Sequence, residues 1–139
     1  MVVTMLRNRS RSHGERGAAA VEFALILPLL VMLVFGIIQF SIAYNRQQGL
    51  HAAAREGARI ASLPQTTKTD ITNRVTDSLT GITFESGPTI TVTPNATKPC
   101  DQRSGQTVVV SVQGVTQLDI PMWGNQSITL TGRGEFRCE

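Results

Sequence analysis

The sequence predicts an α+β protein, with an N-terminal transmembrane helix that extends outside the membrane into a small domain of one helix and an antiparallel sheet. Three observations lead to this prediction. A long apolar segment lies near the N-terminus, helix-forming residues follow it, and apolar residues alternate with polar ones towards the C-terminus. The 139 residues suffice for one small domain and an anchor. We expect a basic leader at residues 1–17, a transmembrane and extended helix at 18–63, and an extracytoplasmic domain at 64–139.

The apolar segment is long enough to span a bilayer. Between Arg16 and Arg46 lie 29 residues, of which only Glu22 is charged. As a helix, residues 18–44 would measure ~40 Å, which exceeds the ~30 Å hydrocarbon core of a membrane. A cleaved secretory signal is the alternative. The apolar region of such a signal is shorter, about 7–15 residues, and a small-residue cleavage site follows it, which residues 41–44 do not offer.

Positive charge is concentrated before the apolar segment. Residues 1–17 contain four arginines and one glutamate, whereas residues 45–139 contain nine basic and eight acidic side chains. The positive-inside rule therefore predicts a single-pass protein with a cytoplasmic N-terminus and an external C-terminal domain. Because the single Tyr and the single Trp lie far from the arginines, we expect no nucleic-acid partner.

Small residues recur every four positions after the span. Gly49, Ala53, Gly57 and Ala61 would form a ridge along one helix face that lets another backbone approach closely. One interpretation is an Ala-rich helix lying on its own domain, with glycine merely tolerated. The other interpretation is a ridge that packs closely against a partner. This use would explain the two interior glycines, each of which costs about 1 kcal/mol relative to alanine. Its partner is either the attached domain or another subunit.

A second helix is predicted within the C-terminal domain. Ile71, Val75 and Leu79 have helical spacing, Thr69 is a suitable N-cap, and Gly81 is a suitable end.

Strands are predicted after this helix, because the apolar period falls to two. The alternating apolar positions are Ile90 and Val92, then Val108, Val110 and Val112, and finally Ile128, Leu130, Phe136 and Cys138, with Gly132 and Gly134 on the same face.

The two cysteines, Cys100 and Cys138, both lie in the outer domain. Exported chains meet an oxidising compartment, so a disulfide between them is expected. A metal site is the alternative, but the sequence has no CxxC motif and His51 is the only outer histidine.

No catalytic residues can be assembled from the sequence, so we expect neither an enzyme nor a cofactor. His13 and His51 are lone histidines in polar or helical surroundings, where solvation is the simplest interpretation. Met122 and Trp123 next to Gly124 suggest either a loop that covers the core or an adhesive tip.

Three stretches together resemble the TadE-like family, the pseudopilins of tight-adherence systems related to type IV pili. They are "RGAAAVEFALILPLL", "AAAREGARIAS" and the closing "LTGRGEFRCE". The resemblance is strong from Arg16 to about Ser62 and weaker over the last dozen residues.

The resemblance implies a bacterial cytoplasmic membrane protein with a pilin-like α+β layout. It also implies cleavage after Gly17 by a prepilin peptidase, which would leave Ala18 as the new N-terminus and Glu22 as its fifth residue. Glu22 and Phe23 would then act in subunit assembly. Type IV pilins proper usually begin with Phe after the cut, and this chain has Ala.

Glu22 has two interpretations. One is a carboxylate at the membrane interface near a helix N-terminus, where the helix dipole favours negative charge by about 0.3–1 kcal/mol. The other is pairing with the freed amine of Ala18 in a neighbouring subunit, so that each charge compensates the other inside an apolar bundle.

Two functions follow from these expectations. The first is a minor pseudopilin that takes part in assembling a tight-adherence pilus or related secretion complex, with other pilin or pseudopilin subunits, the peptidase and the assembly platform as partners. The second is a single-pass anchored binding module that is neither cleaved nor assembled.

Overall fold

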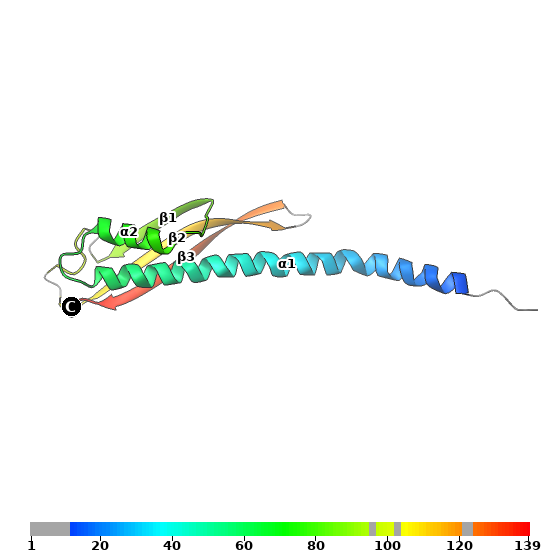
Figure 1. Cartoon of the computed structure of the whole chain (residues 1–139), viewed down its shortest axis with the longest axis horizontal. Coiled ribbons are helices and arrows are strands. Elements are labelled where there is room, and N and C mark those ends of the chain that lie inside the picture. Colours follow the sequence, from blue (N-terminus) through cyan, green and yellow to red (C-terminus); the bar gives the residue numbers. More distant parts are fainter. Residues whose placement is uncertain (1–11, 95–96, 102–103, 121–123) are drawn as a thin grey trace, which may run out of the picture.

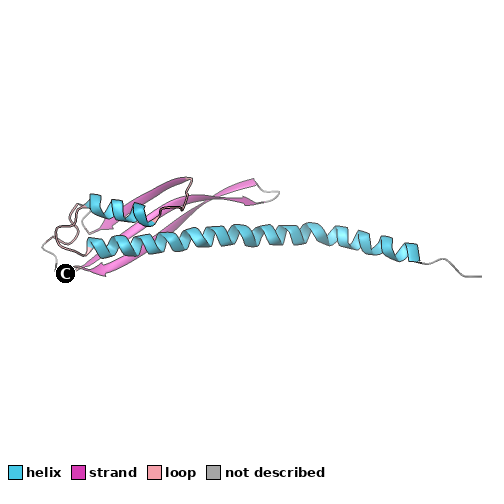
Figure 2. Ribbon diagram, in the orientation of Figure 1, coloured by secondary structure: helices cyan, strands magenta, loops and turns pink. Residues whose placement is uncertain are grey.

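One long helix, α1 (Ser12–Ala61), runs the length of the molecule, and the rest of the chain packs on its C-terminal part (Figure 1). The computed structural model describes residues 12–94, 97–101, 104–120 and 124–139, with side chains from Gly17 onward. After α1 come α2 (Lys68–Ser78) and the strands β1 (Ser86–Thr93), β2 (Thr107–Ile120) and β3 (Gly124–Arg137). This arrangement confirms the predicted α+β class (Figure 2).

The helix α1 has two parts with different surroundings. None of residues 17–42 is buried, and we call this segment the free arm. From Ala43 onward one face of α1 is buried against the sheet and α2. The core of the C-terminal domain is therefore shared between this helix and residues 64–139, and the backbone N–H of Glu139 donates to the carbonyl of Ser62 at the end of α1.

The three strands form an antiparallel sheet in the order β1-β2-β3. Val110 of β2 lies at its centre, opposite Val92 of β1 and Gly134 of β3, and all three residues belong to the buried face. The predicted alternation is confirmed in each strand. Phe136 lies on the same face as Val108 but remains 40% exposed.

The backbones of α1 and β3 lie in direct contact. A Cβ atom added to Gly132 would overlap backbone atoms of Leu50 and His51, and one added to Gly134 would overlap backbone atoms of Ala54 and Arg55. Glycine at these two positions removes the side chains that would otherwise hold the helix away from the strand.

The small-residue ridge of α1 packs on the attached domain. Ala53 and Ala61 are fully buried, and a Cβ added to Gly57 would come within 2.5 Å of Val75 in α2. At Gly49 the added atom would overlap the side chain of Ile82, which follows α2. Of the two partners considered for this ridge, the structure places the domain against it.

The helix α2 begins two residues earlier than the sequence suggested. Its N-cap is Thr67, not Thr69, because Thr67 and Asp70 form a reciprocal capping box. The Thr67 hydroxyl and backbone N–H both donate to the Asp70 carboxylate, which holds the pKa of that carboxyl below its usual range. The predicted inward face is confirmed, since Ile71, Val75 and Leu79 are buried.

We predict that Gly134→Ala lowers the free energy of unfolding by about 1–3 kcal/mol, because the added methyl group overpacks the contact between α1 and β3. Pulse proteolysis in urea of the detergent-solubilised protein would measure the change. Gly36→Ala is the matched control, since nothing lies within 4 Å of a Cβ atom at that position. Equal stability of the two variants would contradict the close approach.

Candidate functional site

The residues expected to act in processing and assembly all lie on the free arm. Gly17, Ala18, Glu22 and Phe23 are exposed, and Phe23 keeps 59% of its surface accessible. The arm exposes large apolar side chains along its length, and its composition and length meet the requirements of a membrane-spanning helix. No tertiary contact within the described chain covers these four residues, which leaves the arm free to bind lipid or other helices.

The position of Glu22 in α1 bears on its role. It lies ten residues after Ser12, where the helix begins. The effect of the helix dipole decays within the first turn, so the N-terminus of α1 stabilises this carboxylate little in the intact chain. Glu22 forms no ion pair with any side chain that the structure describes.

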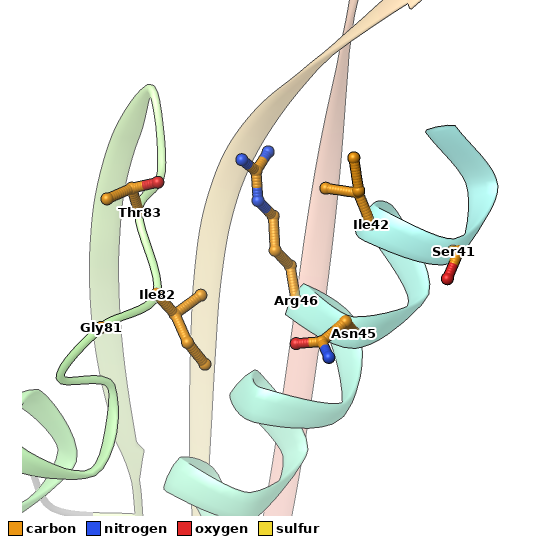
Figure 3. A pocket seen from close by; sticks show the side chains of 7 residues that line it. All are labelled: Ser41, Ile42, Asn45, Arg46, Gly81, Ile82 and Thr83. Carbon is orange, nitrogen blue, oxygen red and sulfur yellow. The ribbon is translucent and has the colours of Figure 1, made fainter. Parts of the chain in front are cut away.

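A shallow polar cleft of about 290 Å³ lies where the free arm meets the domain. Figure 3 shows the Arg46 side chain extending from α1 into the space beside the segment Gly81–Thr83 (Figure 3). Arg46 also borders a second cleft of about 300 Å³ that contains Glu85 and Asp119. Charged groups therefore reappear at the level of Arg46, where the uncharged part of α1 ends.

Sequence reasoning missed an ion cluster that joins α1 to α2. Glu56 accepts hydrogen bonds from Arg59 Nε at 3.1 Å and Nη2 at 2.8 Å, and from Arg74 Nε at 2.8 Å. The hydrogen bonds from Arg59, followed by those from Arg74, lower the pKa of Glu56 from its ordinary value of 4.5 to about 2. Arg59 lies one turn along the same helix, a spacing visible in the sequence, but only the fold brings Arg74 to the same carboxylate.

This cluster gives the stretch "REGAR" (55–59) a structural explanation. Glu56 binds Arg59 and Arg74, Gly57 contacts Val75, and Ala58 is fully buried. Each of these residues contributes to holding α1 on the domain.

His51 is partly buried rather than solvated. Its Nδ1 atom accepts a long hydrogen bond of 3.4 Å from the backbone N–H of Arg133, and its Nε2 atom lies 3.0 Å from the amide nitrogen of Gln47. Gln47 also donates to the carbonyl of Thr131 at 2.7 Å. The pair therefore connects α1 to the β3 backbone beside Gly132, and the sequence interpretation of His51 was wrong because the strand that it contacts is 82 residues away.

Cys100 and Cys138 lie at disulfide distance, with their Cα atoms 5.4 Å apart, and both are nearly fully buried. The bridge joins the connection before β2 to the chain end, across 38 residues of sequence. Constraining a loop of this length stabilises a fold by about 4 kcal/mol in the chain-entropy account.

No cluster of three or more metal-binding side chains occurs in the part of the chain that the structure describes. Met122 and Trp123 lie outside the described residues, as does the leader up to Arg11.

One comparison with known proteins gives a match. The model of the family described as TadE-like protein matches residues 17–59. This match confirms the resemblance over these residues, from the glycine of the expected processing site to the last arginine of "REGAR". The closing stretch "LTGRGEFRCE" lies outside the matched residues. No curated protein and no solved structure matches the chain.

The ion cluster predicts a specific dependence of stability on pH. Because folding depresses the pKa of Glu56, its stabilising contribution is present above pH 4.5 and is lost as the pH falls towards 2. Glu56→Gln should lower the free energy of unfolding by about 1 kcal/mol at pH 7, a value that allows for the solvent exposure of the pairs. The difference from wild type should disappear between about pH 4.5 and 2.

Urea unfolding of the solubilised protein at several pH values would test this dependence. Glu85→Gln is the control, because Glu85 forms no ion pair with any described residue. If both variants lost the same stability at pH 7, the cluster would not be the cause.

Proposed function

We propose that this TadE-like chain is a minor pseudopilin, which takes part in assembling a tight-adherence pilus or a related secretion complex in the bacterial cytoplasmic membrane. The observation that carries the proposal is the free arm: an exposed apolar helix with one carboxylate, attached rigidly to a small outer domain. The family match supports it, because residues 17–59 cover the arm and its attachment to the domain.

The arm would serve as an anchor before assembly and as a packing surface afterwards. In the membrane its apolar side chains face lipid, and in an assembled complex they face the arms of neighbouring subunits. The small-residue ridge does not compete for this role, since the attached domain already covers it. Contacts between subunits would therefore use the arm itself.

Processing is proposed at the bond between Gly17 and Ala18. A prepilin peptidase on the cytoplasmic side would remove the basic leader and leave a free amine on Ala18. Gly17 is exposed and without tertiary contacts in the described chain, so no part of the folded domain obstructs this bond.

Glu22 would then pair with the Ala18 amine of a neighbouring subunit. Acidic residues in a membrane-spanning helix are unfavourable unless a partner compensates the charge. No side chain that the structure describes forms an ion pair with Glu22, so the compensating charge would come from a neighbouring subunit. The pair would fix the axial register between neighbouring arms.

We predict that Gly17→Leu blocks cleavage, because a bulky side chain replaces the uncluttered backbone at the scissile bond. The variant should be heavier than wild type by the mass of the 17-residue leader, as measured by mass spectrometry of membrane-extracted protein. Gly36→Leu is a control that places the same side chain in the arm away from the bond. If both proteins kept the leader and differed only by the mass of the substitution, the result would favour the uncleaved binding module.

We further predict that Glu22→Gln leaves membrane insertion and cleavage near normal but prevents assembly. The Ala18 amine would lack its counter-charge in an apolar bundle, at a cost of about 3–5 kcal/mol per fully buried contact. Co-purification of tagged subunits with the pilus machinery would measure the loss. Glu22→Asp retains the carboxylate and should retain part of the assembly, whereas wild-type recovery of Glu22→Gln would exclude the pairing.

A further inference from the structure

An apolar cleft of about 410 Å³ lies between α1 and the end of the β2–β3 hairpin. Its walls are formed by Phe40, Ala43 and Tyr44 of α1 and by Leu118, Ile120 and Ile128 of the hairpin. The hairpin end extends beside α1 towards the free arm (Figure 1). The rings of Phe40 and Tyr44 stack at the helix wall, with their centroids 6.2 Å apart.

The end of the hairpin is poorly stabilised by the rest of the sheet. The strand β1 pairs with β2 only as far as Val115, so the segments 116–120 and 124–128 form a two-stranded ribbon. Such ribbons are marginal in water without a covered apolar face. Here the face of the ribbon towards α1 is apolar and open. Ile120 on the ribbon is 36% exposed, and Phe40 on the opposite wall of the cleft is 71% exposed. No group among the residues that the structure describes covers the cleft.

The depth of the cleft along α1 identifies what covers it. The uncharged residues 23–45 measure ~34 Å as a helix, slightly more than the ~30 Å hydrocarbon core. A core centred on this segment ends near Tyr44, and one that begins at Ala18 ends near Ile38. In the first case Phe40 and Tyr44 both lie within the outer leaflet, and in the second Phe40 lies in the headgroup layer and Tyr44 at its outer surface. The hairpin wall lies beside these two residues.

The backbone of the hairpin sets a limit on this depth. Beyond Val115 both strands have an open edge with unpaired N–H and C=O groups, which hydrocarbon does not tolerate. The side chains that alternate with the cleft residues, among them Gln117 and Asp119, are polar and exposed. The ribbon is thus apolar towards the arm and polar towards water, which suits the boundary between headgroups and acyl chains.

We propose that lipid of the outer leaflet fills this cleft, so that the domain rests on the membrane through the end of the β2–β3 hairpin. The lipid-facing surface of the arm continues into the cleft, because Phe40 belongs to both and the exposed Tyr44 follows it one turn along α1. The inference rests on the proposed membrane anchoring of α1. A second copy of the chain is the competing occupant.

The test measures nitroxide accessibility in phosphatidylcholine vesicles that contain the full chain. A single added cysteine is labelled while the native disulfide stays oxidised. Leu118→Cys probes the cleft, Gln117→Cys the opposite face of the same strand, Thr91→Cys the exposed face of β1, and Leu33→Cys the membrane span. For each label, collisions with oxygen, which concentrates in lipid, are compared with collisions with a water-soluble nickel chelate.

We expect oxygen to dominate at positions 118 and 33, and the chelate to dominate at positions 117 and 91. Chelate-dominated collisions at position 118 with lipid exposure retained at position 33 would overturn this inference alone. An aqueous label at position 33 would overturn the anchoring as well. Spectral broadening at position 118 that disappears on dilution with unlabelled protein would assign the cleft to a second copy and reject the lipid.

Discussion

The direct contact between the backbones of α1 and β3 is the constraint on which the rest of the structure depends. Gly132 and Gly134 present no side chain to the helix, and they meet backbone atoms of Leu50, His51, Ala54 and Arg55 directly. Little apolar surface is therefore available at this contact, and its stability relies on dense packing over a short distance. Larger side chains complete the core, and they are Leu50 of α1, Ile71 and Val75 of α2, and Val108, Val110 and Val112 of β2.

This contact also directs the remaining elements. With α1 held on β3, the helix α2 packs on the small-residue ridge of α1 at Gly57. Glu56 of α1 also binds Arg74 of α2. The disulfide between Cys100 and Cys138 ties the chain end to the connection before β2. The orientation of the domain relative to α1 is thus defined by packing, by an ion cluster and by a covalent bond. A domain held in this way has a defined position relative to the free arm.

The rigid attachment connects the proposed assembly to the proposed membrane contact. Because α1 is one helix from the arm to the core, the hairpin end lies at a defined depth beside the arm. Lipid would cover the hairpin before assembly. Extraction of the arm into a complex would uncover the cleft and expose it to neighbouring subunits, which gives this surface a different environment in each state.

The sequence by itself determined the features that depend on local order along the chain. Apolar length predicted the span, period-two alternation predicted the strands, and helical spacing predicted the inward face of α2. The capping residue was misplaced by two positions, because Thr67 and Thr69 are both suitable caps and the Asp70 carboxylate selects between them. The similarity of residues 17–59 to the TadE-like family was likewise visible in the motifs.

Only the tertiary structure decided which distant residues meet. The ridge of α1 was visible, but its partner was not, because Val75 and Ile82, which contact Gly57 and Gly49, are not adjacent to them along the chain. The contact of His51 with Arg133, the binding of Arg74 to Glu56 and the cleft beside Phe40 depend on the same long-range approach. Local patterns predict which face of an element is apolar, whereas the choice of partner depends on shape and distance in the folded chain.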